Sequence, residues 1–353
     1  MASIEAIIFD WAGTVIDFGS CAPVVAMENT FAGEGMKVEQ DVIRRYMGMA
    51  KREHVIAILS EPAVGARWRD AKGADWTEAD VDRVMIALEP AMQSAATEHS
   101  QLIPGAAAAV SAAREKGIRI GSTTGYTRTM MTGILPAAAK QGYVPDVTIC
   151  AGETAQGRPA PLMLWQAMAQ LKAWPAARCV AVDDAPVGIE AGRNAGLWTI
   201  GVVASGNGIG MDADAWAALD ATEQAARLRP VIASFDAVGA DFVIQSVADL
   251  ALALDAIEHA VDAGCHPGGA ASARWRRAPG APPPARLRRS RRCANSRGRS
   301  TPATGPHDAD ALWPRQRVGK SAHLAPRDPV TAGCSSAVAY AAAAARRRGR
   351  PGR

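Results

Sequence analysis

The chain has 353 residues, enough for about two domains with hydrophobic cores, and a formal net charge of +4 at pH 7. That charge averages two unlike parts: residues 266–353 contain 19 Lys and Arg against 3 Asp and Glu, a net +16, whereas residues 1–265 carry −12. An acidic body of this kind gives no reason to expect a nucleic acid as its partner.

The sequence shows neither membrane nor disulfide signals. It has no basic and apolar leader and no run of about 18 apolar residues. The body contains Cys21, Cys150 and Cys179, an odd and widely spaced set that does not form a disulfide framework. We therefore expect a soluble, cytoplasmic protein.

Short apolar runs separated by helix-like stretches predict a parallel sheet with crossover helices. The expected strands lie at residues 4–10, 118–124, 146–150, 178–184, 197–203 and 241–247. Ligands of such sheets bind beyond the carboxyl ends of the strands. An Asp or Thr after a strand is often only a cap or turn residue. Their joint arrangement nevertheless predicts one site formed from Asp10, Thr123, Thr124, Asp183 and Asp184.

Residues 21–100 contain no clear strand and predict an all-helical insertion after the first strand. Apolar residues at near-helical spacing over residues 42–58 predict a helix that includes Lys51. Thr77, followed by acidic residues, predicts the start of another helix. The expected organisation is an α/β core of residues 1–20 and 101–258 with a helical lid of residues 21–100.

The basic segment at residues 266–353 is rich in Arg, Pro, Gly and Ala and shows no sustained period. Such a composition cannot bury enough apolar surface to offset its ordering entropy, so we predict disorder. Two interpretations stay open. The segment is either a basic arm for nucleic acid or an anionic surface, or an incidental translation of GC-rich DNA past a shifted stop codon.

Four motifs in chain order, FDWAGT, GSTTGYTRTMM, GRPAP and VDDAPVGIEAGRNAG, resemble those of the haloacid dehalogenase superfamily. More narrowly, DWAGTVIDFG, MGMAKREHV and GSTTGYT look like the phosphonoacetaldehyde hydrolase (phosphonatase) family, over about residues 4–258. The resemblance implies a Rossmann-like core with an inserted helical cap and a homodimer. It also implies hydrolysis of the C–P bond of phosphonoacetaldehyde to acetaldehyde and phosphate, in 2-aminoethylphosphonate degradation.

Position 12 distinguishes this chain from ordinary phosphatases of the superfamily. Those enzymes usually place an acid/base Asp two residues after the nucleophile, because a departing alkoxide must be protonated. This chain has Ala12 there. Breaking a C–P bond releases a carbanion, which needs an electron sink, and an imine between Lys51 and the substrate aldehyde would supply one. Ala12 also fits a phosphatase that has lost its activity, and that alternative stays open.

The resemblance assigns four catalytic residues. Asp10 would be the nucleophile that forms an aspartyl phosphate, and Lys51 the Schiff-base amine, its pKa lowered by partial burial. His54 would assist proton transfers during imine formation, although a surface or capping histidine fits equally well. Arg158 takes the place of the usual lysine and would neutralise phosphoryl oxygens and orient Asp10.

The resemblance also implies Mg²⁺, held by Asp10, the Ala12 backbone carbonyl and Asp184. Many relatives have a second acidic residue four places after the last ligand, but this chain has Gly188, so we expect Asp183 to share that role. Gly13 is expected to let the chain turn closely past the phosphate, and Thr14 together with the next helix start to offer backbone N–H groups to it. The predicted substrate-binding residues are Gly13, Thr14, Met47, Thr124, Gly125 and Tyr126.

Two other classes of protein remain open. An ester phosphatase or phosphomutase of the same fold predicts an acid at position 12, and a non-catalytic protein acting through its basic tail predicts salt-dependent binding without turnover. Removing residues 266–353 separates these classes. The hydrolase hypothesis predicts that phosphate release from phosphonoacetaldehyde survives the truncation, whereas loss of turnover in a folded truncated chain would contradict it.

Overall fold

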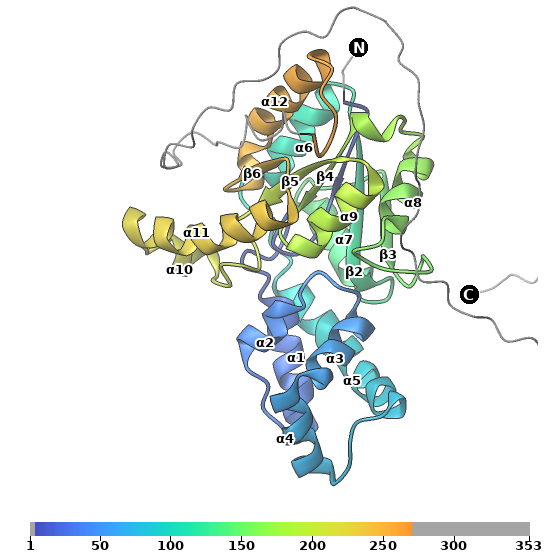
Figure 1. The fold of residues 1–353 in the computed structure, drawn as a ribbon, viewed down its shortest axis with the longest axis vertical. Coiled ribbons are helices and arrows are strands. Elements are labelled where there is room, and N and C mark those ends of the chain that lie inside the picture. The colour runs from blue at the N-terminus through green and yellow to red at the C-terminus, as the bar shows by residue number, and fades with distance from the viewer. Residues whose placement is uncertain (1–3, 270–353) are drawn as a thin grey trace, which may run out of the picture. The chain divides into compact units, whose positions relative to one another are not determined.

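The computed structural model describes residues 4–269, and their centre is one parallel sheet (Figure 1). The strand order is β3-β2-β1-β4-β5-β6. The chain thus builds outward from β1 in both directions, and ligands of such sheets bind where that direction reverses. The predicted α/β fold is confirmed. The strands are β1 (Ala6–Phe9), β2 (Arg119–Thr127), β3 (Val147–Ala151), β4 (Cys179–Asp183), β5 (Trp198–Val202) and β6 (Phe242–Ile244).

Helices cover both faces of the sheet because successive side chains of each strand point to opposite sides. Ile7 and Phe9 pack with α6, α7 and α12, whereas Ala6 and Ile8 pack with α8 and α9. The core helices are α6 (Ala106–Glu115), α7 (Met131–Lys140), α8 (Leu162–Leu171), α9 (Pro186–Ala195), α10 (Ala213–Ala217), α11 (Ala221–Val238) and α12 (Leu250–Asp262), with 3₁₀ helices at Ala176–Arg178 and Val247–Asp249.

Of the six helices between β1 and β2 in the sequence, the first five, α1 to α5, gather together in space (Figure 1). We call residues 21–100 the cap. The cap has its own apolar interior, in which Val24, Met27 and Phe31 of α1 are buried on a helix that packs along α5. The helices are α1 (Ala22–Gly33), α2 (Gln40–Arg45), α3 (Lys51–Ser60), α4 (Pro62–Lys72) and α5 (Glu78–Glu98).

The single helix expected over residues 42–58 is wrong. α2 ends at Arg45, α3 begins at Lys51, and a turn separates them. Gly48 in that turn has φ +90°, and a Cβ there would lie 2.8 Å from Cγ1 of Val187 in α9. The helix is interrupted because this turn touches the core, where only glycine fits. Lys51 is consequently the first residue of α3.

The end of the described chain refines the boundary proposed for the basic segment. The predicted disorder of residues 270–353 lies outside the described residues. The backbone N–H of Gly268, however, donates to Oδ1 of the buried Asp241 at 2.9 Å. A truncation should therefore follow Gly269. Within residues 4–269, no helix combines the length and apolarity needed to cross a bilayer.

The start of α5 at Thr77 is confirmed and supplies a test of the cap's stability. The Thr77 hydroxyl accepts from the N–H of Asp80, and the Asp80 carboxylate accepts from the N–H of Thr77. Thr77→Ala removes one half of this capping box and should lower the free energy of unfolding by about 1 kcal/mol. Thr77→Ser keeps the hydroxyl and should cost much less in urea titrations. Equal losses in the two variants would contradict the capping role.

Candidate active site

Strand register brings the first polar residues together. Phe9 of β1 lies opposite Val182 of β4 on one side and Ser122 of β2 on the other. The residues that follow Phe9 and Val182, which are Asp10 and Asp183, therefore also lie side by side. The N–H of Asp10 donates to the carbonyl of Val182 at 2.9 Å. This arrangement places Asp10 at the point where the strand order reverses.

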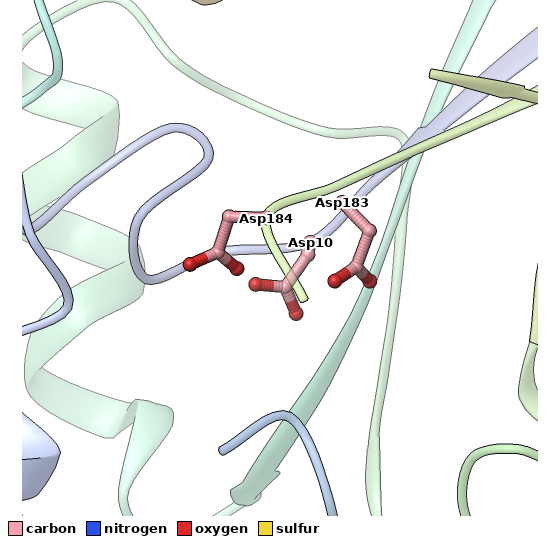
Figure 2. Close-up of side chains that lie close together, drawn as sticks. All are labelled: Asp10, Asp183 and Asp184. Carbon is pink, nitrogen blue, oxygen red and sulfur yellow. The ribbon is translucent and has the colours of Figure 1, made fainter. Parts of the chain in front are cut away.

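Three buried carboxylates occupy this point. One oxygen from each of Asp10, Asp183 and Asp184 lies within 4.8 Å of the others, and Figure 2 shows Asp10 between the other two. Burial, reinforced by the neighbouring carboxylates, raises the pKa of Asp183 and of Asp184 above their ordinary values. A buried group of oxygens short of positive charge fits a hard divalent cation such as Mg²⁺.

Arg158 is the cation that this cluster already contains. Its Nη2 lies 2.7 Å from Oδ1 of Asp10, and its Nη1 lies 3.3 Å from Oδ2 of Asp183. Nη2 also donates to Oγ1 of Thr123 at 2.9 Å. Burial disfavours the guanidinium charge, but the two carboxylates beside it keep the pKa of Arg158 above its ordinary value. Arg158 thus fixes the orientation of Asp10, as expected of a planar fork.

The structure explains why position 188 has no side chain. A Cβ on Gly188 would lie 1.9 Å from Oδ2 of Asp183, inside the space that this carboxylate occupies. Asp183 is held there by the N–H of Ala185, which donates to its Oδ1 at 3.0 Å. The Asp183 carboxylate therefore occupies the space that a side chain at position 188 would need.

Above the carboxylates lies a small cavity between the cap and the core. Its volume is about 20 Å³, room for about one water molecule. A substrate with several heavy atoms can therefore enter only if the cap and the core move apart. The lining residues are Asp10, Ala12, Ser20, Pro23, Met47, Gly48, Met49, Lys51, Thr124, Gly125, Tyr126, Arg158 and Asp184.

Lys51 reaches this cavity from the cap. Its side chain is 3% exposed, and its Nζ lies 5.3 Å from the centroid of the Tyr126 ring. Burial lowers the pKa of Lys51 to about 8, although the charge of Asp10 works in the opposite direction. A substantial fraction of this amine is consequently neutral near physiological pH, as a nucleophilic amine must be.

His54 is buried one helical turn beyond Lys51 and does not line the cavity. Its Nε2 lies 2.7 Å from the carbonyl of Ile43, so that nitrogen carries the proton, and its Nδ1 has no hydrogen-bond partner among the described residues. Burial first, and the charge of Lys51 second, lower the pKa of His54 to about 3. The alternative of a surface histidine is wrong, whereas a role in proton transfer stays a prediction.

Gly13 and Thr14 do not line the cavity. Their N–H groups donate within the turn, to the carbonyls of Ile16 and Trp11, and the next helix, α1, begins at Ala22. Gly13 has φ +81°, and a Cβ there would lie 2.2 Å from Oδ2 of Asp184. Gly13 thus makes room for Asp184, and a contact of these N–H groups with the phosphate stays a prediction.

The structure adds four residues that the sequence did not assign to the pocket. Ser20 lies in the connection from the core into α1, Pro23 lies in the first turn of α1, and nothing in their type signals a pocket. Gly48 and Met49 flank the assigned Met47, and the carbonyl of Gly48 accepts a 3.4 Å hydrogen bond from Arg158. A Cβ on Gly125 would lie 2.6 Å from the Met49 carbonyl, so the glycine of GSTTG allows the cap turn to approach.

Comparison with known proteins agrees with this geometry. The model of the haloacid dehalogenase-like hydrolases matches residues 4–196. The phosphonoacetaldehyde hydrolase of Paraburkholderia xenovorans is 46% identical over 250 residues, covering 71% of this chain and 94% of that protein. The homologue from Hahella chejuensis, with the same name, is 40% identical over 255 residues, covering 72% and 87%.

A solved structure extends the comparison. The phosphonoacetaldehyde hydrolase-like protein of Oleispira antarctica matches with a TM-score of 0.75 and 38% identity, over 75% of this chain and 96% of that one. The fold and the buried acidic site define a haloacid dehalogenase-like hydrolase. Within that superfamily, this chain belongs to the phosphonoacetaldehyde hydrolase family.

The burial of Lys51 gives a testable pH dependence. Below its pKa the amine is protonated and unreactive, so its modification by an amine reagent should rise with pH and reach half its maximum near pH 8. Reductive methylation of the magnesium-free protein, followed residue by residue by mass spectrometry, measures this profile. The exposed Lys140 serves as the internal reference. A midpoint for Lys51 above pH 10 would contradict the effect of burial.

Proposed function

We propose that this protein hydrolyses the C–P bond of phosphonoacetaldehyde to acetaldehyde and phosphate. The observation that carries the proposal is the meeting of Lys51 and Asp10 in one cavity that also contains Ala12. An amine can activate an aldehyde, and a carboxylate can attack phosphorus, so one small substrate would engage both groups. The same name borne by the relatives supports the choice of substrate.

Imine formation would be the first chemical step. The neutral amine of Lys51 attacks the aldehyde carbon, and loss of water leaves a protonated imine. Tyr126 lies beside the amine, and its buried hydroxyl has no partner among the described residues, so it is available to the aldehyde oxygen. His54 behind Lys51 would accept or return a proton through the unpaired Nδ1. Exclusion of water by the closed cap would protect the imine.

Phosphoryl transfer would follow. An Asp10 oxygen forms a bond to phosphorus while the C–P bond breaks, and the electron pair of that bond moves into the imine to give an enamine. Arg158 holds Asp10 at 2.7 Å and would neutralise the phosphoryl oxygens. The Thr124 hydroxyl accepts from the N–H of Tyr126 at 3.1 Å, which leaves its proton for a phosphate oxygen.

Release of the two products would complete the cycle. Water attacks the aspartyl phosphate, freeing phosphate and Asp10. The enamine takes up a proton on carbon, and hydrolysis of the resulting imine frees acetaldehyde and Lys51. No departing alkoxide needs protonation at any stage, which agrees with Ala12 where a phosphatase has an acid.

The carboxylates of Asp10 and Asp184 with the Ala12 carbonyl would hold Mg²⁺, since hard oxygens are its preferred ligands. When bound, the ion supplies positive charge to the phosphoryl oxygens. Asp183 would keep Arg158 in place beside these ligands. We further infer that the protein is a cytoplasmic homodimer whose reaction serves the degradation of 2-aminoethylphosphonate, in line with the family resemblance.

Replacement of Lys51 tests the proposal. Lys51→Arg keeps a positive charge but cannot form an imine, so acetaldehyde release from phosphonoacetaldehyde with Mg²⁺ should fall by about a thousandfold or more. Lys140→Arg, on the surface of α7, is the matched control and should retain full activity. A folded Lys51→Arg enzyme with normal turnover would refute the imine. A folded wild type without turnover would refute the proposed substrate.

A further inference from the structure

Arg44, near the end of α2, connects the cap to the core at three places. Its Nη1 donates to the carbonyl of Gly19 at 2.8 Å, in the linker that leads into the cap, and to Oδ1 of Asn207 at 3.2 Å. Its Nη2 donates to the carbonyl of Gly210 at 3.3 Å. One guanidinium thus holds together the cap, the linker and the loop that follows β5.

Asn207 returns the contact and extends it to the active site. Its Nδ2 donates to the carbonyl of Arg44 at 2.9 Å, so the two residues form a reciprocal pair. Its backbone N–H donates to Oδ2 of Asp184 at 2.7 Å, and Asp184 is one of the three clustered carboxylates in Figure 2. A charged donor and a satisfied, half-buried network make this a stronger contact than an exposed ion pair.

The neighbouring glycines leave room for this contact. A Cβ on Gly210, where φ is +65°, would lie 2.8 Å from Nε of Arg44. A Cβ on Gly19, where φ is +85°, would lie 2.1 Å from the carbonyl oxygen of Met211. Side chains at either position would push the linker and the loop away from Arg44.

We propose that Arg44 and Asn207 form a clasp that holds the cap closed and couples closure to the orientation of Asp184. Arg44 is then a positioning residue, which acts on Lys51 and Asp184 without touching the substrate. The roughly 20 Å³ cavity requires the cap to open for substrate entry, so the clasp must break and re-form in each cycle. Its strength sets the fraction of enzyme in which Lys51 faces Asp10.

The first test measures closure without substrate, by hydrogen exchange of the whole protein. In Arg44→Ala, amides in peptides covering residues 44–52 and 203–212 should exchange about tenfold faster, while those of α12 keep their rates. Arg45→Ala is the matched control, because Arg45 pairs with Glu61 and Asp41 inside the cap. Equal exchange in the Arg44 and Arg45 variants would overturn the clasp. Faster exchange throughout the chain would show a merely structural role and would also overturn it.

The second test uses turnover and rests on the proposed function. If the closed fraction of the substrate-bound enzyme falls to about a tenth, kcat should fall about tenfold, because Lys51 faces Asp10 only in the closed state. Asn207→Ala keeps the N–H donor to Asp184, so it isolates the contact with Arg44. It should give a smaller change in the same direction, since Arg44 keeps its bonds to the Gly19 and Gly210 carbonyls, and the double variant should be no worse than Arg44→Ala.

Additive effects in the double variant, or an unchanged kcat in an Arg44→Ala enzyme, would overturn the clasp. Arg44→Lys, which can still reach one carbonyl, replaces Arg44→Ala if that variant does not fold, and should give a smaller change in the same direction. A wild type without turnover would refute the proposed substrate but leave the exchange result valid, so the two failures are distinguishable.

Discussion

Three carboxylates and one guanidinium, buried together at the ends of β1 and β4, impose the main constraint on this structure. Burial disfavours every charge among them, so each must be fixed by a partner. Arg158 bridges Asp10 and Asp183, while Asp184 accepts from the N–H of Asn207. The surrounding glycines at positions 13 and 188 follow from this cluster, because their missing side chains leave space for the carboxylates of Asp184 and Asp183.

The cap adds what the core lacks. In the proposed reaction the core alone would offer a nucleophile and oxygen ligands, which suit many phosphoryl transfers. One fold of this kind hosts many different functions. The cap turn carrying Gly48 brings Lys51 to the same cavity. Burial in the closed cavity excludes water from the Lys51 amine and lowers its pKa. The proposed chemistry is thus divided between carboxylates at the end of the sheet and an amine on the cap.

Much of this arrangement could be predicted from the sequence, since apolar runs marked the strands and parallel register then brought their last residues together. The capping box at Thr77 was equally local. The break before Lys51 could not be predicted, because it depends on contact between Gly48 and Val187, far apart in the sequence. The same holds for Gly13 and Thr14, whose N–H groups are used in a turn, and for Ser20, whose place beside the cavity depends on how the cap folds back.

The central claim is that Lys51 forms a covalent imine with the substrate, and chemical trapping tests it most directly. Borohydride added to the enzyme during turnover would reduce the imine to a stable secondary amine. The account predicts a substrate-dependent mass increase confined to the peptide that contains Lys51, with simultaneous loss of activity. An active enzyme that acquires no adduct on Lys51 under these conditions, or acquires it on another lysine, would contradict the account.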